Sequence, residues 1–360
     1  MGNIDSHPQI LTQGEADSFR VKNPHIIFVD AFSRQLKELF FIDNHEYIGM
    51  EKEKVYETDD FKKYAIEKES NFTYIYYPWN YHLVKCIQEE DYFRLKTNRN
   101  QDLITAEEQI KLASYNVAVL GMSVGSNIAF VLTQAGISKH ITIADFDALD
   151  TTNLNRILAG VHQIGINKTV VAAQRIYEDN PFAKVTLWSS GVNMDNLETA
   201  LKDKKINCIV EEIDDIAFKI STRLLAIKYQ VPVVMVTDNG DGVVLHVERY
   251  DLGHKKIWGK DTNYFEKVLT DGPMTKERSG AIIMNDIVGG PHKVDPKMLA
   301  SVKRVLAKEL VSWSQLGSAA ILGGVVTTYI IKKIALGESL DPDIRSYITP
   351  ESIEHSTHSL

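Results

Sequence analysis

The stretch NVAVLGMSVGSNIAFVLTQAG, residues 116–136 of this 360-residue chain, is the most informative about its fold. An apolar run that predicts a strand is followed by a turn and then by an apolar, helix-like stretch. In the turn, Gly121 and Gly125 let the backbone bend tightly and approach a phosphate, because neither has a Cβ. The helix expected from about Ser126 offers free N–H groups to an anion. The stretch therefore predicts a nucleotide site but not which nucleotide, because the strict G-x-G-x-x-G pattern is absent.

Strand-like and helix-like segments alternate after this unit. That alternation predicts a three-layer, Rossmann-like α/β domain with a mostly parallel sheet covered by helices on both faces. The strand-like runs are 116–120, 140–145, 184–188, 207–212 and 231–236. A long crossover is expected over 251–296, followed by helices near 297–311 and 316–336.

The N-terminal part has a different pattern. Aromatic and β-branched residues cluster at 25–30, 37–43 and 71–79 and predict strands, and 91–96 predicts a helix. We therefore expect a small α+β domain over 1–94, which serves substrate recognition or packs on the core. The main domain is expected over 95–340 and a polar tail over 341–360.

Composition excludes several classes of protein. Forty Lys and Arg residues against 48 Asp and Glu give a net charge of −8, which argues against a nucleic-acid duplex as partner. The two cysteines, Cys86 and Cys208, cannot build a disulfide scaffold or a four-sulfur zinc site. The polar N-terminus predicts a cytoplasmic protein. The apolar run 316–331 is shorter than the ~20 residues that span a bilayer, so we expect a core or dimer-interface helix there and no membrane.

Acids and cations follow the expected strand ends. Asp145-Phe146-Asp147 lies about 20 residues past the glycine turn, where a carboxylate binds ribose hydroxyls in nucleotide sites. Arg156 and Lys168 come next, and such cations offset the charge of a triphosphate. The run Glu211-Glu212-Ile213-Asp214-Asp215 could hold Mg²⁺ or could be a solvated loop.

The order of these motifs resembles the ubiquitin-activating-enzyme-like superfamily, whose bacterial members include ThiF, MoeB and HesA. The resemblance runs from about Arg94 to Tyr250 and more loosely through 316–336. It rests on an Arg-containing segment before the first strand, the D-F-D, N-L-N-R and I-G-x-x-K elements, Asn180-Pro181, and Glu211 to Asp214. Members of that superfamily use ATP to activate a carboxylate as an acyl-adenylate.

The resemblance implies a role for each matching residue. It places the Gly121–Gly125 turn, with Ser123, against the α-phosphate, and the acids Asp145 and Asp147 at the ribose. It implies that Asn153, Arg156 and Lys168 contact the triphosphate, that Asp214 holds Mg²⁺, and that Arg99 reaches the site of a second subunit. The implied catalytic set is Arg99, Arg156, Lys168 and Asp214, the implied cofactors are ATP and Mg²⁺, and the implied assembly is a homodimer.

Several features depart from the family pattern. The glycine turn is one residue shorter, with Ser123 and Val124 in place of glycines, and Asp215 replaces the usual Asn. The C-x-x-C pairs that bind zinc in many relatives are absent, so no zinc is expected. Residues 251–296 contain no cysteine, so no thioester can form there. We therefore expect an adenylate that remains bound or passes to an external nucleophile.

These observations favour an ATP-dependent adenylyltransferase, a nucleotidyltransferase of the ThiF type. Its acceptor would be a carboxylate of a ubiquitin-like carrier, a peptide or an RNA-linked group such as a tRNA. Two alternatives stay open. One is a nucleotide-binding scaffold without catalysis, which the shortened turn favours. The other is an NAD(P)-dependent oxidoreductase, against which the Arg156 and Lys168 pair counts.

Overall fold

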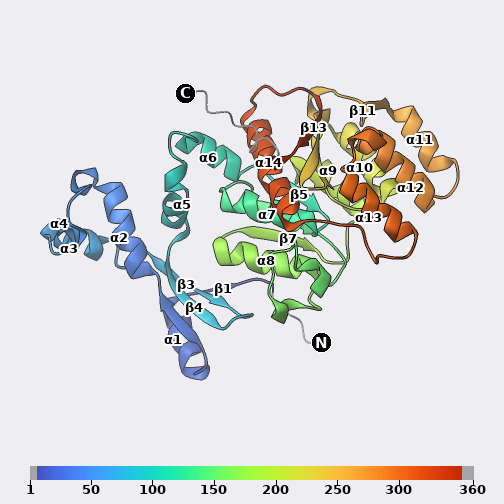
Figure 1. Ribbon diagram of the computed structural model, residues 1–360. Coiled ribbons are helices and arrows are strands. Elements are labelled where there is room, and N and C mark those ends of the chain that lie inside the picture. Colours follow the sequence, from blue (N-terminus) through green and yellow to red (C-terminus); the bar gives the residue numbers. More distant parts are fainter. Residues whose placement is uncertain (1–5, 351–360) are drawn as a thin grey trace, which may run out of the picture. The chain divides into compact units, whose positions relative to one another are not determined.

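The computed structural model describes residues 6–350 of the chain (Figure 1). They form two compact units. One contains the chain up to Gln109 together with Tyr177–Phe182, and the other contains Ile110–Ile176 and the chain from Ala183 onward. The domain boundary near residue 94 remains a prediction.

The first unit is built on a four-stranded sheet in the order β1-β3-β4-β2. The strands β3 and β4 form an antiparallel hairpin, and β2 pairs with β4 in parallel at one edge. The strands are β1 (Gln9–Leu11), β2 (Ile27–Asp30), β3 (Phe72–Tyr77) and β4 (His82–Ile87). The helices are α1 (Gln13–Lys22), α2 (Phe32–Asp43), α3 (Lys52–Tyr56), α4 (Asp59–Glu67) and α5 (Glu89–Thr97), with short 3-10 turns η1 (His45–Tyr47) and η2 (Asn98–Asn100); α6 (Ala106–Ala113) crosses into the second unit.

One predicted strand of this unit is wrong. Residues 37–43 lie in the helix α2 rather than in a strand. Leu36, Leu39 and Phe40 recur at helical spacing and are buried on one face. The ring of Phe40 packs against Phe61 and Tyr64, with centroids 5.2 and 5.3 Å apart. Packing on this helical face outweighs the strand preference of the aromatic residues.

The second unit contains a seven-stranded sheet in the order β13-β10-β9-β8-β5-β6-β7. The five strands from β9 to β7 are parallel, and β10 and β13 are antiparallel additions at one edge. The predicted mostly parallel α/β fold is confirmed. The bounds are β5 (Val117–Leu120), β6 (His140–Ala144), β7 (Lys184–Trp188), β8 (Cys208–Glu211), β9 (Val233–Asn239), β10 (Gly242–Glu248) and β13 (Asp343–Ile348). The last strand lies within the segment expected as a polar tail, and residues 351–360 lie outside the described part.

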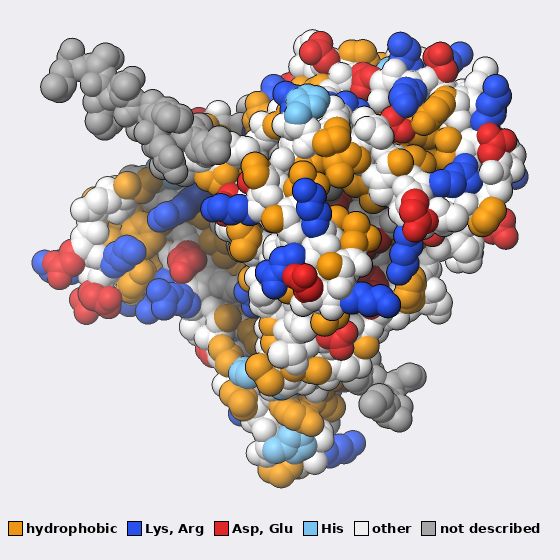
Figure 2. Space-filling view, turned by 45° about the vertical axis from the view of Figure 1, so that its right-hand side comes forward, with side chains coloured by type: hydrophobic (Ala, Val, Ile, Leu, Met, Phe, Trp, Pro, Cys, Tyr) orange, Lys and Arg blue, Asp and Glu red, His pale blue; other side chains and the backbone are white. Residues whose placement is uncertain are grey.

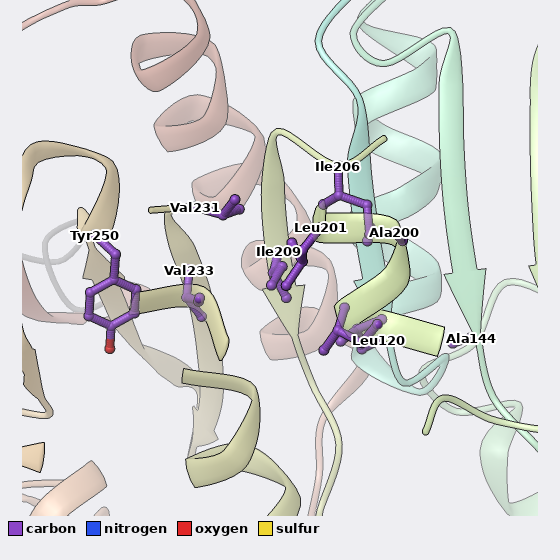
Figure 3. Packing of buried hydrophobic residues seen from close by; sticks show 12 residues of the cluster. Leu120, Ala144, Ala200, Leu201, Ile206, Ile209, Val231, Val233 and Tyr250 are labelled. Atoms are coloured by element: carbon purple, nitrogen blue, oxygen red, sulfur yellow. The ribbon is translucent and has the colours of Figure 1, made fainter. Parts of the chain in front are cut away.

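Helices cover both faces of this sheet. Ala118 and Leu120 of β5 pack with α9 (Met194–Lys202) and α10 (Ile216–Tyr229) in one apolar cluster, part of which Figure 3 shows. Val119, between them, points to the opposite face, where a Cβ on Gly125 of α7 (Val124–Gln134) would lie 2.9 Å from its Cγ1. The same face carries α14 (Gly317–Leu336), which lies beside α7 (Figure 1).

The helix α14 is long and apolar enough to cross a membrane by length and composition alone. In the structure it packs on α7, β9 and β10. Two glycines allow this close approach, since a Cβ on Gly323 would lie 3.1 Å from Val236 Cγ2 and a Cβ on Gly324 would lie 3.2 Å from the Asn127 backbone. We therefore describe α14 as a core helix of this unit.

The crossover 251–296 has regular structure of its own. It contains the turn η5 (Tyr250–Leu252), the short strands β11 (Lys256–Ile257) and β12 (Lys260–Asp261), the helices α11 (Thr262–Thr270) and α12 (Lys276–Ile282), a π-helical turn η6 (Ile283–Ile287) and the turn η7 (Pro291–Lys293), and α13 (Pro296–Leu306) follows it. Trp258, Phe265 and Ile287 bury their side chains against Ile220 of α10 and Met235 of β9. The crossover is thus part of the core of this unit.

A buried ion network ties the crossover to the sheet. The fully buried Arg223 of α10 donates to Glu248 of β10 across 2.7 Å and to Glu211 of β8 across 2.9 Å. Glu248 also accepts a hydrogen bond from the Trp258 backbone at 3.0 Å. The nearly buried Lys219 adds a second cation 3.1 Å from Glu211. Two buried acids are thus matched by two cations, which limits the cost of removing their charges from water.

Candidate nucleotide site

The glycine turn between β5 and α7 requires glycine at its first position. Gly121 has φ +95°, and a Cβ there would lie 2.6 Å from the carbonyl oxygen of Glu212. Its backbone N–H donates to the Ala144 carbonyl at 2.8 Å, so the turn is joined to β6 as well. The backbone at Gly121 therefore passes close to the end of β8, at the carboxyl edge of the sheet where ligands bind in such folds.

Asp145 supports this turn from the next strand. Its carboxylate accepts a hydrogen bond from the Met122 N–H at 2.7 Å and one from the Asp147 N–H at 2.8 Å. Both oxygens are therefore engaged by the backbone. In this arrangement Asp145 orients the turn, whereas the carboxylate of Asp147 remains half exposed.

Asp147 pairs with Lys168 at the start of α8 (Lys168–Asp179). The Lys168 Nζ lies 2.7 Å from a carboxylate oxygen of Asp147, and the Lys168 N–H donates to the Asp147 carbonyl at 2.9 Å. The Lys168 side chain is 10% exposed, whereas that of Asp147 is 52% exposed. The lysine is thus held in place by packing, while the acid is open to solvent.

Arg156 joins the glycine turn to the segment that precedes α8. Its Nε donates to Ser123 Oγ, at the N-cap of α7, across 3.0 Å. Its Nη1 donates to the Thr152 carbonyl and to Asn155 Oδ1 at 3.1 and 2.9 Å. Its carbonyl accepts from the buried Asn127 of α7 at 2.8 Å. Arg156 is therefore fixed at the N-terminus of α7, where an anion is favoured.

Asn153 has a local structural role. It ends the 3-10 turn η3 (Thr151–Asn153), and its Oδ1 accepts from the Asp150 N–H at 3.0 Å. A second 3-10 turn, η4 (Val161–Gln163), follows before α8. Asn153 thus shapes the segment that presents Arg156.

The run of acids at the end of β8 divides into four environments. Glu211 is fully buried in the ion network. Glu212 accepts the Val236 N–H at 2.9 Å, and burial raises the pKa of its carboxyl well above the ordinary value. Asp214 is exposed. Asp215 is the N-cap of α10 and accepts the Phe218 N–H at 2.7 Å. Asp and Asn are about equally favoured at this position, so Asp in place of the family's Asn is compatible with the capping role.

Sequence reasoning missed Asp238. It lies near the carboxyl end of β9, is 6% exposed, and accepts a hydrogen bond from Gln315 Nε2 at 3.2 Å through Oδ2. Its buried Oδ1 has no hydrogen-bond partner among residues 6–350. Burial raises the pKa of this carboxyl to about 6, with Gln315 and Arg156 acting to lower it and Asp214 acting to raise it. An acid two residues after the apolar run VPVVMV was the available signal.

The structure joins most of the predicted site residues. Hydrogen bonds join Asp145, Asp147 and Lys168 in one group and Ser123 and Arg156 in another, and the backbone of the glycine turn links the two groups. Gly125 lies in the same turn, and Asn153 lies three residues before Arg156. Arg99 belongs to the first unit, where it is exposed in η2. No group of three or more His, Cys, Asp or Glu side chains suited to a metal occurs within residues 6–350.

Both cysteines are buried thiols. Cys208 lies in β8 with no exposed surface, and Cys86 lies in β4 of the first unit. Burial raises the pKa of each thiol above the ordinary value. Both therefore stay protonated at neutral pH and pack as small apolar residues.

Comparison with known proteins decides the family, because the ThiF family matches residues 95–341, more than half of the sequence. The chain belongs to the ThiF family. The match covers the whole nucleotide site described above, from Gly121 to Asp238.

Two curated relatives match this ThiF-family chain over different lengths. An uncharacterized protein of Mycobacterium tuberculosis is 29% identical over 348 residues, which is 94% of this chain and 43% of that protein. Ubiquitin-like modifier-activating enzyme 5 of Caenorhabditis elegans is 26% identical over 150 residues, which is 39% of this chain and 35% of that enzyme. The chain thus spans less than half the length of these curated relatives.

Among solved structures, tRNA N6-threonylcarbamoyladenosine dehydratase (TcdA) of E. coli, in complex with AMP, has the same fold. The TM-score is 0.51 at 19% sequence identity, and the alignment covers 69% of this chain and 96% of TcdA. A second structure of that enzyme, in complex with ATP, gives a TM-score of 0.50. At this identity the likeness concerns the fold.

Proposed function

We propose that this chain is an ATP-dependent adenylyltransferase that activates a carboxylate as an acyl-adenylate. The observation that supports this most is the set of contacts around the glycine turn. Arg156 bonds Ser123 at the N-terminus of α7, and Lys168 is held at Asp147. Two fixed cations beside a phosphate-binding turn suit a triphosphate, whereas a dinucleotide cofactor needs neither.

In the proposed reaction an ionised carboxylate oxygen attacks the α-phosphorus of ATP. The new P–O bond forms as the bond between the α-phosphorus and the bridging oxygen of the β-phosphate breaks, and pyrophosphate leaves with the bonding electrons. No proton has to move, because the carboxylate is already ionised at neutral pH. Positioning and charge stabilisation therefore supply the catalysis.

Each residue has one task in this scheme. The backbone of the Gly121–Gly125 turn holds the α-phosphate, and Asp147 accepts hydrogen bonds from the ribose hydroxyls. Arg156 and Lys168 neutralise charge on the β- and γ-phosphates as pyrophosphate departs. Asn153 and Asp145 keep the segment and the turn in position.

The carboxylates at the ends of β8 and β9 fit a divalent cation. Asp214 is an exposed oxygen donor, and Asp238 Oδ1 is a buried acceptor that residues 6–350 leave unpartnered. Hard oxygen ligands of this kind suit Mg²⁺, which binds one or two carboxylates together with substrate phosphates. When bound, Mg²⁺ would offset phosphate charge, and Asp214 would hold it.

We propose a protein or peptide carboxylate as the acceptor rather than an RNA-linked one. On the face in Figure 2, Lys and Arg side chains are interspersed with Asp and Glu side chains. The net charge is −8. A continuous positive surface, which RNA binding favours, is not a feature of that face. With both thiols buried, the adenylate passes to an external nucleophile.

The proposal is tested by exchange of labelled pyrophosphate into ATP. Full-length protein, ATP and Mg²⁺ are incubated with synthetic peptides that end in a free carboxylate, and the same peptides with C-terminal amides are the matched control. Pyrophosphate exchange is expected only with the peptides that have free carboxylates. We expect Arg156→Ala to abolish this exchange and Arg304→Ala, a change on the exposed surface of α13, to leave it intact. Exchange that Arg156→Ala leaves at the wild-type rate contradicts the proposal.

A catalytically silent nucleotide-binding scaffold is the second candidate, and the shortened glycine turn favours it. It predicts ATP binding that Arg156→Ala weakens, with no pyrophosphate exchange for any acceptor. Binding and exchange measured on the same protein distinguish the two.

We also propose that the chain works as a homodimer in which Arg99 completes the partner's site. Arg99→Ala and Arg156→Ala would each be inactive, but mixed subunits would restore about a quarter of the sites by statistical pairing. Recovery on mixing supports the arrangement. No recovery, with subunit exchange shown by sedimentation of labelled chains, contradicts it. A cytoplasmic location likewise remains a proposal.

A further inference from the structure

The strongest unassigned feature of the second unit is the orphaned carboxylate oxygen of Asp238. The side chain is more than nine-tenths buried, and Oδ1 has no hydrogen-bond partner among the residues that the structure describes. A buried carboxylate without full hydrogen bonding is costly, so such a group calls for a ligand. Within residues 6–350, the one side chain that bonds the Asp238 carboxylate is that of Gln315.

The pairing of β8 with β9 brings Asp214 and Asp238 to the same edge of the sheet. Ile209 and Val210 of β8 pair with Val233 and Val234 of β9, an offset of 24 residues. The bond from the Val236 N–H to the Glu212 side chain keeps the same offset beyond the end of β8. Asp214 follows Glu212 by two residues, and Asp238 follows Val236 by two. Asp238, on β9, and Asp214, in the loop that follows β8, therefore both lie at the carboxyl edge of the sheet.

The alternation of side chains along β9 indicates the face of the sheet on which Asp238 lies. Val236 faces α14 and α7, since a Cβ on Gly323 would lie 3.1 Å from Val236 Cγ2 and 3.2 Å from Val124 Cγ1. Asp238 is two residues further along β9 and so faces the same side. Val124 is the first residue of α7, so Asp238 points to the side where the phosphate-binding helix begins.

The charged side chains near Asp238 suit a cation that would bind between the phosphates of a nucleotide and the carboxylates. Arg156 and Asp214 both act on its carboxyl, and Asp238 in turn acts on Glu212. Arg156 bonds Ser123 rather than forming an ion pair with Asp238 within residues 6–350. Asp238 is thus close enough to Arg156 for their charges to interact, although the two side chains form no ion pair within residues 6–350.

We propose that Asp238 and Asp214 together ligate the divalent cation of the nucleotide site, with Asp238 as a second protein ligand from the neighbouring strand. The proposal rests on the proposed function in that the same cation meets the β- and γ-phosphates. Its ligand chemistry is two carboxylates completed by water and phosphate oxygens, which is the coordination that Mg²⁺ and Mn²⁺ accept.

The test measures Mn²⁺ alone, without nucleotide, on the full chain. The fraction of free Mn²⁺ is followed by electron paramagnetic resonance for the wild type, Asp214→Asn, Asp238→Asn and Asp241→Asn. Asp241 is the matched control, since it is an exposed acid in the turn of the same β9–β10 hairpin. We expect Asp238→Asn and Asp214→Asn each to weaken Mn²⁺ binding by at least about tenfold, and Asp241→Asn to bind as the wild type does.

Wild-type Mn²⁺ affinity in Asp238→Asn overturns the proposal. Circular dichroism checks that each variant is folded. The variant Asp238→Glu keeps the carboxylate on a longer side chain. If the carboxylate itself is the ligand, Asp238→Glu retains more Mn²⁺ affinity than Asp238→Asn. Equal losses in these two variants contradict ligation. Failure of pyrophosphate exchange with intact Mn²⁺ binding would contradict the proposed function and leave this site standing.

Discussion

Arg156 Nε donates a hydrogen bond across 3.0 Å to Oγ of Ser123, the residue at the N-cap position of the helix α7. The contact fixes a guanidinium at the position where the positive end of the helix already favours an anion. It also gives Ser123, which stands where relatives carry a flexible glycine, a task of its own. The shortened turn is thus rigid and cross-linked.

Removal of that contact should weaken nucleotide binding without unfolding the protein. Ser123→Ala deletes one hydrogen bond to a charged donor, a contribution of about 1.5–3 kcal/mol in folded proteins. We expect ATP affinity to fall by about tenfold or more, measured by calorimetry. Ser114→Ala, which removes only a local bond to the Lys111 carbonyl, is the control. Equal affinities in Ser123→Ala and the wild type would show that Arg156 is positioned by its other contacts.

Gly121→Ala should disrupt the turn by steric contact as well as by backbone strain. Its added Cβ meets the Glu212 carbonyl at 2.6 Å and forces β8 and the turn apart. Gly253→Ala is matched to it, because Gly253 has φ +82° but open space around a Cβ. We expect Gly253→Ala to cost about 1–2 kcal/mol of unfolding free energy, and Gly121→Ala to cost more and to abolish ATP binding. Similar stabilities, measured in urea, would contradict the close approach.

The buried ion network should contribute strongly to stability. Arg223→Met leaves Glu248 with only the Trp258 N–H as a partner, so an uncompensated charge stays buried. Removal of one partner of such a pair costs about 3–5 kcal/mol. The control is Arg304→Met, since both side chains of the Arg304–Glu309 pair are more than half exposed and such pairs contribute at most about 1 kcal/mol. A urea midpoint for Arg223→Met close to that of Arg304→Met would contradict this account.

His246 should make the second unit sensitive to acid. It lies buried in β10 with Nε2 2.9 Å from the Ile287 carbonyl. Burial, with the charges of Arg223, Arg345 and Lys219 nearby, lowers the pKa of the imidazole from 6.5 to about 3. The unfolded chain takes up a proton near pH 6.5 and the folded chain does not, so stability is full above pH 6.5 and falls below it by up to about 1.4 kcal/mol per pH unit.

The variant His246→Gln keeps a donor for the Ile287 carbonyl and removes the titration. We expect its unfolding free energy, measured in urea between pH 7.5 and about pH 4.5, to fall less steeply with acid than that of the wild type. Parallel slopes for the two proteins would mean that His246 takes up its proton in the folded state.

The sequence was sufficient for the main sheet, whereas the predicted roles of the nucleotide-site residues stay predictions. The parallel strands and the glycine turn are local patterns, and Asp147, Arg156 and Lys168 follow them in a fixed order. Residues 37–43 were misassigned because the burial of Leu39 and Phe40 depends on partners such as Phe61 and Tyr64. Strand order is a long-range property, so the sequence alone did not indicate that Asp238 and Asp214 lie at the same edge of the sheet.

Acids that are close together in the sequence have different environments in the structure, which the sequence alone did not indicate. Asp145 and Asp147 are equivalent in sequence, but the first is engaged by two backbone N–H groups and the second faces solvent beside Lys168. Glu211 and Asp214 are close in sequence, but the first belongs to the buried ion network and the second is exposed. Such distinctions depend on side-chain direction at the edge of the sheet.

The most direct test of the central claim is calorimetric titration of the full chain with ATP in the presence of Mg²⁺. The account predicts binding of one ATP per chain that depends on Mg²⁺, disappears in Arg156→Ala and persists in Arg304→Ala. Absence of ATP binding to a folded wild-type protein, or equal binding in Arg156→Ala and the wild type, would contradict the assignment of the Gly121–Gly125 turn and Arg156 as the nucleotide site.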